Sequence, residues 1–531
     1  MKPLIPRLTS LLLLILLIWS ISFQPAGADS ATISGTVEDG NGQVEGAHVR
    51  VRATGNFTLT ADDGSFNLGG LTAGEEIEVT AWSDGYYVAS TLVVPPASAV
   101  ELLLRPYHTQ DDPTYTWIDP TPGSSDKACG DCHPQILPQW QANAHAGSVS
   151  NPRFYSMYNG TDTSGAIPVA PGFVNDFPGT AGNCASCHAP GSAVDGYLVT
   201  DLNAVRGELT AGIHCDYCHK VGGVFLDPSA GSVYPNSPGV ISQRILRPPA
   251  EEQIFIGPYD DIPDPDTYLP LFSESQFCAP CHQFSFWGIP IYESFNEWLG
   301  SPYAQAGITC QDCHMPPNGD THYALPEVGG LPHPPESIPS HLQLGAESVN
   351  LLQNSVDLSV QMNQIGSMVE IEVVITNSSA GHHVPTDHPG RHLILHIVLE
   401  DESGLPLEQL SGPVVPGWGG FQAGEPGKAF GKILRDLESG KYPVVSYWKQ
   451  TSLLADNRIP AGAHDRTKYT FSAPSVGEQV TLEVELRFRR LFQDLMQEKG
   501  WETPDIIMEQ TTQTLVIEPW WQYYLPISVS P

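Results

Sequence analysis

All ten cysteines of the 531-residue chain fall into five Cys-x-x-Cys-His units. Two thiols three residues apart can add to the two vinyl groups of one heme, and the adjacent histidine then reaches the iron from the same turn. Zinc knuckles or redox dithiols would give no reason for a histidine after every second cysteine. The pattern therefore predicts five covalently attached hemes c. The predicted attachment residues are Cys129, Cys132, Cys184, Cys187, Cys215, Cys218, Cys278, Cys281, Cys310 and Cys313, and the predicted proximal iron ligands are His133, His188, His219, His282 and His314.

The spacing of the five motifs is uneven and partly repeated. Their first cysteines stand at positions 129, 184, 215, 278 and 310, so the separations are 55, 31, 63 and 32 residues. The stretch Ala211–Cys215 is echoed by Ala306–Cys310, and the motif at Cys184 is echoed by the one at Cys278. This indicates a duplicated two-heme unit, with convergence on one short motif as the alternative. In either case the hemes are expected to lie close enough for fast electron hopping.

Each iron needs a sixth ligand, for which 13 of the 18 histidines remain after the five proximal ones. His145 follows the first motif in a stretch with helical spacing, and His341 follows the last motif. His382 lies in a loop rich in glycine and proline between two expected strands, and His322 lies in the loop after the last motif. These residues are the candidates for distal ligands, with His333 and His383 as further ones.

Three other residues have simpler interpretations. His214 is a weaker candidate ligand because its counterpart in the repeated stretch is Thr309. Lys428 and Lys432 each follow a glycine but lack the Ser or Thr of a phosphate-binding loop, so they are expected to be exposed lysines on a loop.

The first 28 residues are typical of a secretory signal peptide. Lys2 and Arg7 precede an apolar run from Leu11 to about Phe23, and Ala26–Ala28 supplies small residues for cleavage after position 28. The run is shorter than the roughly 20 residues of a membrane span, and no later stretch is apolar for long enough. We therefore expect an exported protein, periplasmic or at the cell surface, with no transmembrane segment in the mature chain.

The formal net charge of −35, from 24 basic and 59 acidic residues, bears on possible partners. A field of this sign disfavours nucleic acid and anionic lipid, and favours partners that present Lys or Arg, or a positively charged oxide surface. Solubility alone is an equally simple explanation. The expected partners are redox proteins or an extracellular electron acceptor, while the oligomeric state stays open.

Three regions follow the signal peptide. Residues 29–106 alternate apolar and polar positions between Gly and Asp turns, which predicts a small β-sandwich. Residues 107–345 hold all five motifs among many prolines and glycines, and are expected to form a loop-rich, mainly α multiheme core. Residues 346–531 return to β-type alternation and predict a second, larger β-sandwich, with one helix near Arg490–Lys499.

Two known families share motifs with these regions. Ser34–Val37, Ala61–Phe66 and Ser83–Tyr86 give the N-terminal region a pattern that resembles the carboxypeptidase regulatory-like family of prealbumin-type sandwiches. This resemblance implies a docking or spacer module. The middle and C-terminal regions resemble multiheme cytochromes of the cytochrome c552/c554 type, related to the hydroxylamine oxidoreductase superfamily. The residues that carry the second resemblance are Trp140–His145, Gly212–His219, Phe277–His282, Asn296–Trp298 with Ser301–Ala304, Gln311–Pro316, and Gly381–His382 with Pro385–Thr386.

The cytochrome resemblance implies that His145, His341 and His382 are distal ligands, and His322 is the candidate for a fourth. Nitrite reductases similar to this family replace one heme-binding histidine by lysine, whereas all five motifs here end in histidine. The hydroxylamine-oxidising members carry more than five hemes. The preferred hypothesis is therefore an electron carrier without a catalytic heme. The alternatives are a reductase or oxidase of a small nitrogen or sulfur compound at a five-coordinate heme, and a subunit of a conductive filament or surface complex.

Overall fold

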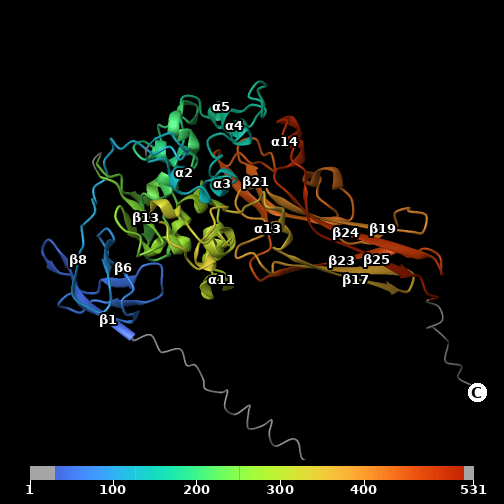
Figure 1. Cartoon of the computed structure of the whole chain (residues 1–531). Coiled ribbons are helices and arrows are strands. Elements are labelled where there is room, and N and C mark those ends of the chain that lie inside the picture. The colour runs from blue at the N-terminus through green and yellow to red at the C-terminus, as the bar shows by residue number, and fades with distance from the viewer. Residues whose placement is uncertain (1–29, 126, 250–251, 520–531) are drawn as a thin grey trace, which may run out of the picture. The chain divides into compact units, whose positions relative to one another are not determined.

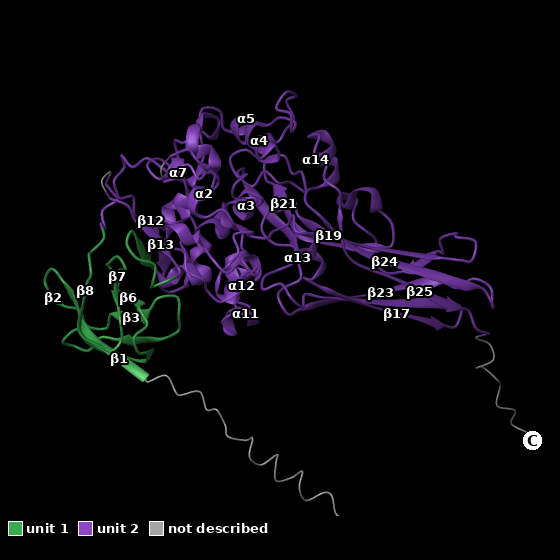
Figure 2. Ribbon diagram, in the orientation of Figure 1, with its two compact units in different colours: residues 1–107, 259–268 green, residues 108–258, 269–531 purple. Residues whose placement is uncertain are grey.

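The computed structural model describes residues 30–125, 127–249 and 252–519 (Figure 1). The expected signal peptide, residues 1–28, lies outside the described residues. The chain divides into two compact units, one of residues 1–107 with 259–268 and the other of residues 108–258 with 269–531 (Figure 2). Within the described residues, no helix has the length and apolar character that crossing a membrane requires.

The first unit consists of two small β-sheets around one core. One sheet has the order β2-β1-β5, with β8 parallel to β1, and the other has the order β4-β3-β6-β7. Alternate residues point inward, so that Ile33 and Leu68 of the first sheet and Val49 and Val79 of the second are all buried in the same apolar cluster. The strands are β1 Ser30–Asp39, β2 Gly42–Gln43, β3 His48–Val51, β4 Phe57–Leu59, β5 Ser65–Thr72, β6 Ile77–Trp82, β7 Ala89–Val93 and β8 Ala97–Leu103.

Residues 259–268 belong to this first unit although they stand between the third and fourth cysteine motifs. Asp260 accepts hydrogen bonds from His48 and Arg50, at 3.2 and 3.3 Å. Asp264 forms a two-oxygen ion pair with Arg105. The β-unit is therefore completed by a segment from the middle of the chain.

The N-terminal half of the second unit is built from short helices. Proline and glycine limit their length, as in α4, where Pro152 follows the capping residue Asn151 and Gly160 ends the helix with a φ of 67°. The helices are α2 Cys129–Cys132, α3 Ile136–Gln141, α4 Pro152–Asn159, α5 Phe173–Asp176, α6 Ala185–His188, α7 Pro190–Ala193, α8 Cys215–Cys218, α9 Ala279–His282, α10 Ser294–Leu299, α11 Pro302–Gln305 and α12 Cys310–His314. Short strands between them are β9 Val221–Val224, β10 Leu226–Asp227, β11 Ser232–Val233, β12 Gln243–Ile245, β13 Phe255–Gly257, β15 Phe284–Phe286 and β16 Ile289–Tyr292, while β14 Asp266–Tyr268 lies within the first unit.

The C-terminal part of the second unit consists of two layered antiparallel sheets (Figure 1). The first has the order β17-β18-β23-β20 and the second the order β22-β21-β19-β24-β25. Ile371 and Tyr469 of the first sheet share one buried cluster with Leu395 and Leu486 of the second. The strands are β17 Asp357–Ile365, β18 Met368–Thr376, β19 His392–Glu400, β20 Gln409–Ser411, β21 Gly427–Asp436, β22 Thr451–Asp456, β23 His464–Ser472, β24 Gln479–Arg489 and β25 Ile506–Val516; the helices are α13 Val349–Gln353 and α14 Gln493–Glu498.

Two buried lysines tie the β-rich part of the second unit to its helical part. Lys499 donates to the carbonyl oxygens of Ser156, Thr161, Val169 and Pro171, at 2.8 to 3.1 Å. Lys432, expected to be exposed on a loop, instead lies in β21 with 2% of its side chain exposed. Its ammonium group is satisfied by a carboxylate and two carbonyl oxygens of the helical part, which is why it can be buried. The middle and C-terminal regions thus form one compact body.

Candidate heme-binding site

Each of the five motifs lies on a single helical turn, in helices α2, α6, α8, α9 and α12. Side chains three and four residues apart share one face of such a turn, so both thiols and the histidine of a motif face the same side. None of the ten cysteines, all of which lie among the described residues, forms a disulfide bond. Each turn can therefore offer two thiols and one imidazole to the same planar group.

Hydrogen bonds orient three of the five proximal rings in the same way. Nδ1 of His133 lies 2.7 Å from the carbonyl oxygen of Tyr323, and Nδ1 of His219 lies 2.8 Å from that of Ile256. Nδ1 of His314 bonds the carbonyl oxygen of Leu344. Because a carbonyl oxygen only accepts, Nδ1 carries the proton and Nε2 keeps its lone pair for a metal.

The ring of His282 has a different partner. Its Nδ1 lies 3.7 Å from a carboxylate oxygen of Asp387. Burial alone would lower the pKa of His282, but Asp387 raises it above its usual value. Burial alone would also raise the pKa of Asp387, but His282, Arg391 and the backbone N–H of Ser294 together hold that pKa well below its usual range. The fourth motif therefore has an anionic partner where three others have neutral ones.

Two distal candidates face proximal histidines. The ring centroids of His145 and His282 are 6.4 Å apart with planes at 86°, and those of His314 and His382 are 6.3 Å apart with planes at 17°. Two imidazoles that share one metal ion, each through a bond of about 2.0–2.1 Å, place their centroids roughly 6 Å apart. Both pairs therefore have the separation that a six-coordinate iron requires.

His341 lies next to two proximal rings. Burial, together with repulsion from His219 and His133, lowers the pKa of His341 to about 3. Gln139 of α3 fixes the backbone, because the N–H of His341 donates to its side-chain oxygen at 2.8 Å. The structure thus places His341 beside the first and third motifs, with His219 exerting the stronger effect.

His322 is not brought opposite a proximal histidine. Its Nδ1 lies 2.9 Å from the hydroxyl oxygen of Thr321, and no histidine ring contacts it within the described parts of the chain. The next residue, Tyr323, supplies the carbonyl oxygen that orients His133. His322 is therefore adjacent to the first motif in the chain, without a geometry that supports ligation.

The proximal rings are enclosed by protein yet border interior space. Burial lowers the pKa of His188 and of His219 to about 4, so both are neutral at pH 7. Both residues are nevertheless partly exposed, and 44% of the side chain of His282 is accessible. Neutral imidazoles that line internal space are suited to hold a metal-centred prosthetic group.

Thiols of different motifs lie close to one another. Cys129 and Cys215, Cys187 and Cys281, and Cys278 and Cys310 are near enough that each affects the pKa of its neighbour. Cys218 of the third motif also lies close enough to Cys278 and Cys281 of the fourth to affect their charge. These contacts connect all five motifs, and the fourth motif is the one that meets three others.

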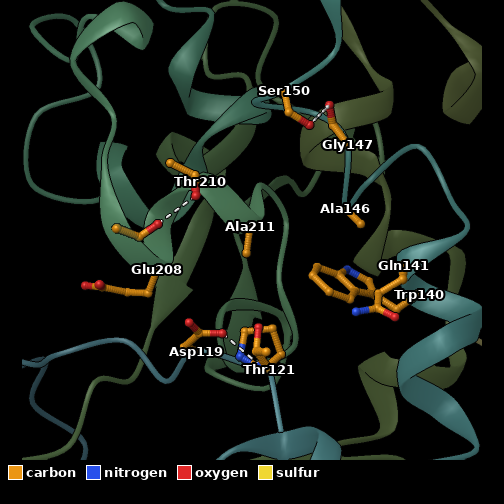
Figure 3. A pocket seen from close by; sticks show the side chains of 12 residues that line it. Asp119, Thr121, Trp140, Gln141, Ala146, Gly147, Ser150, Glu208, Thr210 and Ala211 are labelled. Atoms are coloured by element: carbon orange, nitrogen blue, oxygen red, sulfur yellow. Dashed lines mark hydrogen bonds between the residues drawn. The ribbon is translucent and has the colours of Figure 1, made fainter. Parts of the chain in front are cut away.

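A cavity of about 380 Å³ lies near the first and third motifs (Figure 3). Trp140 and Gln141 line one side, and Thr210 and Ala211 line another. The indole N–H of Trp140 donates to the carbonyl oxygen of Ile213 at 2.9 Å, which fixes α3 against the segment that leads into the third motif. Its remaining lining residues are Asp119, Pro120, Thr121, Ala146, Gly147, Ser150, Gly207 and Glu208.

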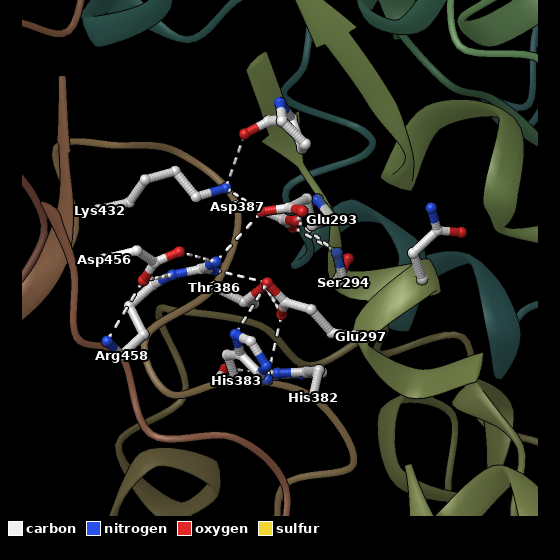
Figure 4. Close-up of polar contacts among 12 residues, drawn as sticks. Glu293, Ser294, Glu297, His382, His383, Thr386, Asp387, Lys432, Asp456 and Arg458 are labelled. Carbon is white, nitrogen blue, oxygen red and sulfur yellow. Dashed lines mark hydrogen bonds and ion pairs between the residues drawn. The ribbon is translucent and has the colours of Figure 1, made fainter. Parts of the chain in front are cut away.

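A buried ionic cluster holds the loop that carries His382 (Figure 4). One carboxylate oxygen of Glu297 accepts from the backbone N–H of His383 at 3.1 Å and from the hydroxyl group of Thr386 at 2.6 Å. The other accepts from Arg458 at 2.5 Å, and Arg458 also pairs with Glu293. Glu297 thereby fixes the loop at two points, His383 and Thr386. Glu297 lies in a stretch that carries the cytochrome resemblance but was given no role of its own, and Asp387 belongs to no motif, so sequence patterns did not identify what either residue does.

Two regions of the chain match models of known protein families. Residues 128–220 match the family model described as cytochrome c554 and c-prime, and residues 32–105 match the carboxypeptidase regulatory-like domain. Both resemblances found in the sequence are thus confirmed. Residues 128–220 thus carry the pattern of a cytochrome c-type family, and residues 32–105 that of a regulatory-like β-domain.

Solved structures give the fold more specifically. A penta-heme cytochrome c552 from Thermochromatium tepidum is similar with a TM-score of 0.54 and 20% identity, over 73% of this chain and 97% of that one. A type II cohesin–X-dockerin complex from Acetivibrio cellulolyticus is 16% identical over 21% of this chain and 73% of that one, with a TM-score of only 0.13. No curated protein matches the chain. The shared fold is that of a penta-heme cytochrome.

Proposed function

We propose that this protein is an exported cytochrome that passes electrons between redox partners through five closely spaced hemes c. The observation that carries the proposal is the network of contacts between the motifs, because it joins all five attachment points into one connected set. Heme iron supplies a reversible one-electron change when bound. The chain's own residues attach, orient and enclose the five groups.

Ring geometry supports two pairs of proposed ligands: His145 with His282 and His314 with His382 would each hold one iron. The effect of His219 on the pKa of His341 supports these two residues as the ligands of a third. The other proximal ligands are His133 and His188. Gln343 lies 2.5 Å from Nδ1 of His145 and fixes the orientation of that ring. The ten motif cysteines form the thioether links, while His322 has no such geometric support.

The outer regions are proposed to position the heme core. The signal peptide directs export, and the N-terminal β-domain serves as a docking or spacer module. The net charge of −35 favours redox partners with a positively charged surface.

Mass spectrometry and reoxidation kinetics of the purified mature protein test the proposal. The expected mass is that of residues 29–531 with five hemes. The fully reduced protein should keep its electrons for minutes with nitrite or hydroxylamine, and lose them within seconds to a ferric acceptor cytochrome. Fewer than five hemes, or bound zinc, would contradict the five-heme assignment, and rapid reoxidation by nitrite would contradict the carrier function.

One observation favours a second candidate, a small-molecule reductase or oxidase at the second motif. The ring that stacks on His188 is the apolar Phe154, with ring centroids 3.8 Å apart. Buried Tyr292 and Tyr447 lie near Cys187, and His388 packs 6.0 Å from Tyr447. A high-spin electron paramagnetic resonance signal that changes with cyanide would identify an open iron there; an exclusively low-spin spectrum would exclude this candidate.

A further inference from the structure

The loop Gly381–Asp387 serves two motifs at once. It presents His382 to His314 of the fifth motif, and Asp387 to His282 of the fourth. We propose that Asp387 is a positioning residue that lowers the reduction potential of the heme held by the fourth motif below the value it would otherwise have. This inference rests on the proposed function, and specifically on His282 being an iron ligand.

The surroundings of Asp387 keep its carboxylate fixed and charged. It accepts hydrogen bonds from the backbone N–H groups of Glu293 and Ser294, at 3.1 and 3.0 Å, and from the Ser294 hydroxyl group at 3.2 Å. Its side chain is 8% exposed. Three donors converge on one carboxylate, as expected for a buried anion that must be satisfied by hydrogen bonds.

The backbone at Asp387 is also constrained. Its φ of 61° is in the left-handed region, which asparagine and aspartate tolerate better than other residues with a side chain. Glu297 and Arg458 hold the preceding residues through Thr386 (Figure 4). The backbone conformation and these hydrogen bonds thus hold the carboxylate beside Nδ1 of His282.

An anionic hydrogen-bond partner changes how strongly an imidazole donates electrons to a metal. A carboxylate attracts the Nδ1 proton and makes the ring a stronger electron donor through Nε2, which favours the more positive oxidation state of the metal. The rings of His133, His219 and His314 have only neutral carbonyl partners. When the fourth heme takes one electron from a donor, no covalent bond forms or breaks, so the effect appears directly in its reduction potential.

The position of the fourth motif makes this effect consequential. Its thiols meet those of the second and fifth motifs, and the third motif is also close. A heme at this junction that is harder to reduce than its neighbours would be the last of them to accept an electron. Asp387 would thereby set the direction in which electrons distribute among the connected hemes.

A spectroelectrochemical titration of the full-length mature holoprotein tests the inference. In Asp387→Asn the side chain keeps its shape and loses its charge, so one midpoint potential should rise by about 59 mV, a tenfold change for one electron. The other four should stay unchanged. The control is Glu274→Gln, which removes an exposed carboxylate four residues before Cys278 and should move no midpoint.

A second variant predicts a shift of opposite sign. Ser294→Ala removes one donor from the Asp387 oxygen that faces His282, so this carboxylate becomes a stronger partner for the ring. The same midpoint potential should therefore fall. The equilibrium constant for reduction of that heme should decrease about threefold, which is the effect of one hydrogen bond. This variant also decides the question if Asp387→Asn does not take up all its hemes.

Unchanged midpoints in fully loaded Asp387→Asn and Ser294→Ala would overturn the inference. Heme content and the low-spin signals of the wild-type protein are measured first. Fewer than five hemes in the wild type would refute the proposed function itself. Five hemes with midpoint potentials that do not change in the Asp387 variant would refute only the role of Asp387.

Discussion

The third and fifth motifs begin with almost the same sequence but differ in what surrounds them. The residue before the first cysteine is His214 in one and Thr309 in the other, and both act as helix caps. Nδ1 of His214 accepts from the backbone N–H of Tyr217 at 3.3 Å, while Thr309 forms a capping box with Asp312. Two chemically different side chains thus do the same local work, and the histidine needs no role as an iron ligand.

The polar partners of the two motifs differ more strongly. In the third motif, Asp216 and Lys220 form an ion pair at 2.6 Å with neither side chain exposed, and Asp216 also accepts from the hydroxyl group of Tyr115. At the equivalent place in the fifth motif, the uncharged Gln311 donates to two backbone carbonyl oxygens. The Cys-x-x-Cys-His spacing is sufficient for the helical turn, whereas the residue after the first cysteine decides whether the turn forms a buried ion pair or uncharged hydrogen bonds.

The largest expected effect comes from breaking the buried ion pair. Asp216→Asn leaves the Lys220 ammonium group buried without its carboxylate, which should reduce the free energy of unfolding by about 3–5 kcal/mol. Guanidinium unfolding of the holoprotein measures the loss. The matched change Gln311→Ala in the fifth motif should cost less than about 1 kcal/mol. Equal losses in the two variants would show that the surroundings of the two motifs do not differ in energy.

Acid should affect the third motif more than the fifth. Burial lowers the pKa of His214 to about 4, whereas an unfolded histidine titrates near 6.5. Between these values the unfolded chain binds a proton that the folded chain does not, so stability falls as the pH falls from about 6.5 to 4. At pH 4.5 this one group should cost about 2–3 kcal/mol relative to pH 7.

The variant His214→Asn isolates this contribution, because asparagine can still cap the helix but does not titrate. Its unfolding free energy should fall by about 2–3 kcal/mol less than that of the wild type between pH 7 and pH 4.5. Thr309→Asn is the control and should leave the pH dependence as it is. An identical pH dependence in His214→Asn and the wild type would show that His214 is protonated equally in both states.

Local sequence predicted local structure well. The Cys-x-x-Cys-His spacing and the alternation of Val369–Ile375 depend only on near neighbours, and these stretches form helical turns and part of strand β18. The β-rich N-terminal and C-terminal regions and the cytochrome-like middle follow from the same signals. Periodicity within one segment is enough to choose between helix and strand.

Contacts between distant segments could not be predicted in this way. The sequence predicts that Lys432 is exposed, because no residue near it in the chain indicates that the carboxylate of Glu293 will allow its burial. Asp387 lacked a motif because its significance depends on where α9 and α10 place His282 and Ser294. Residues 259–268 likewise gave no sign that they complete the first unit. Each case depends on a partner more than a hundred residues away.

The smallest expected effect concerns the residues that cap the two helical turns, His214 of α8 and Thr309 of α12. Thr309→Ala removes the hydroxyl group of the capping box and should cost about 1 kcal/mol of stability, whereas Thr309→Ser keeps that group and should cost little. Amide hydrogen exchange in α12 should quicken in the alanine variant alone, and exchange in α8 should not change. A loss of heme from the fifth motif in Thr309→Ser would contradict a pure capping role, because serine preserves the hydrogen bonds. If His214 and Thr309 are equivalent caps, His214→Thr should retain the capping of α8 and lose only the packing of the histidine ring on Trp117.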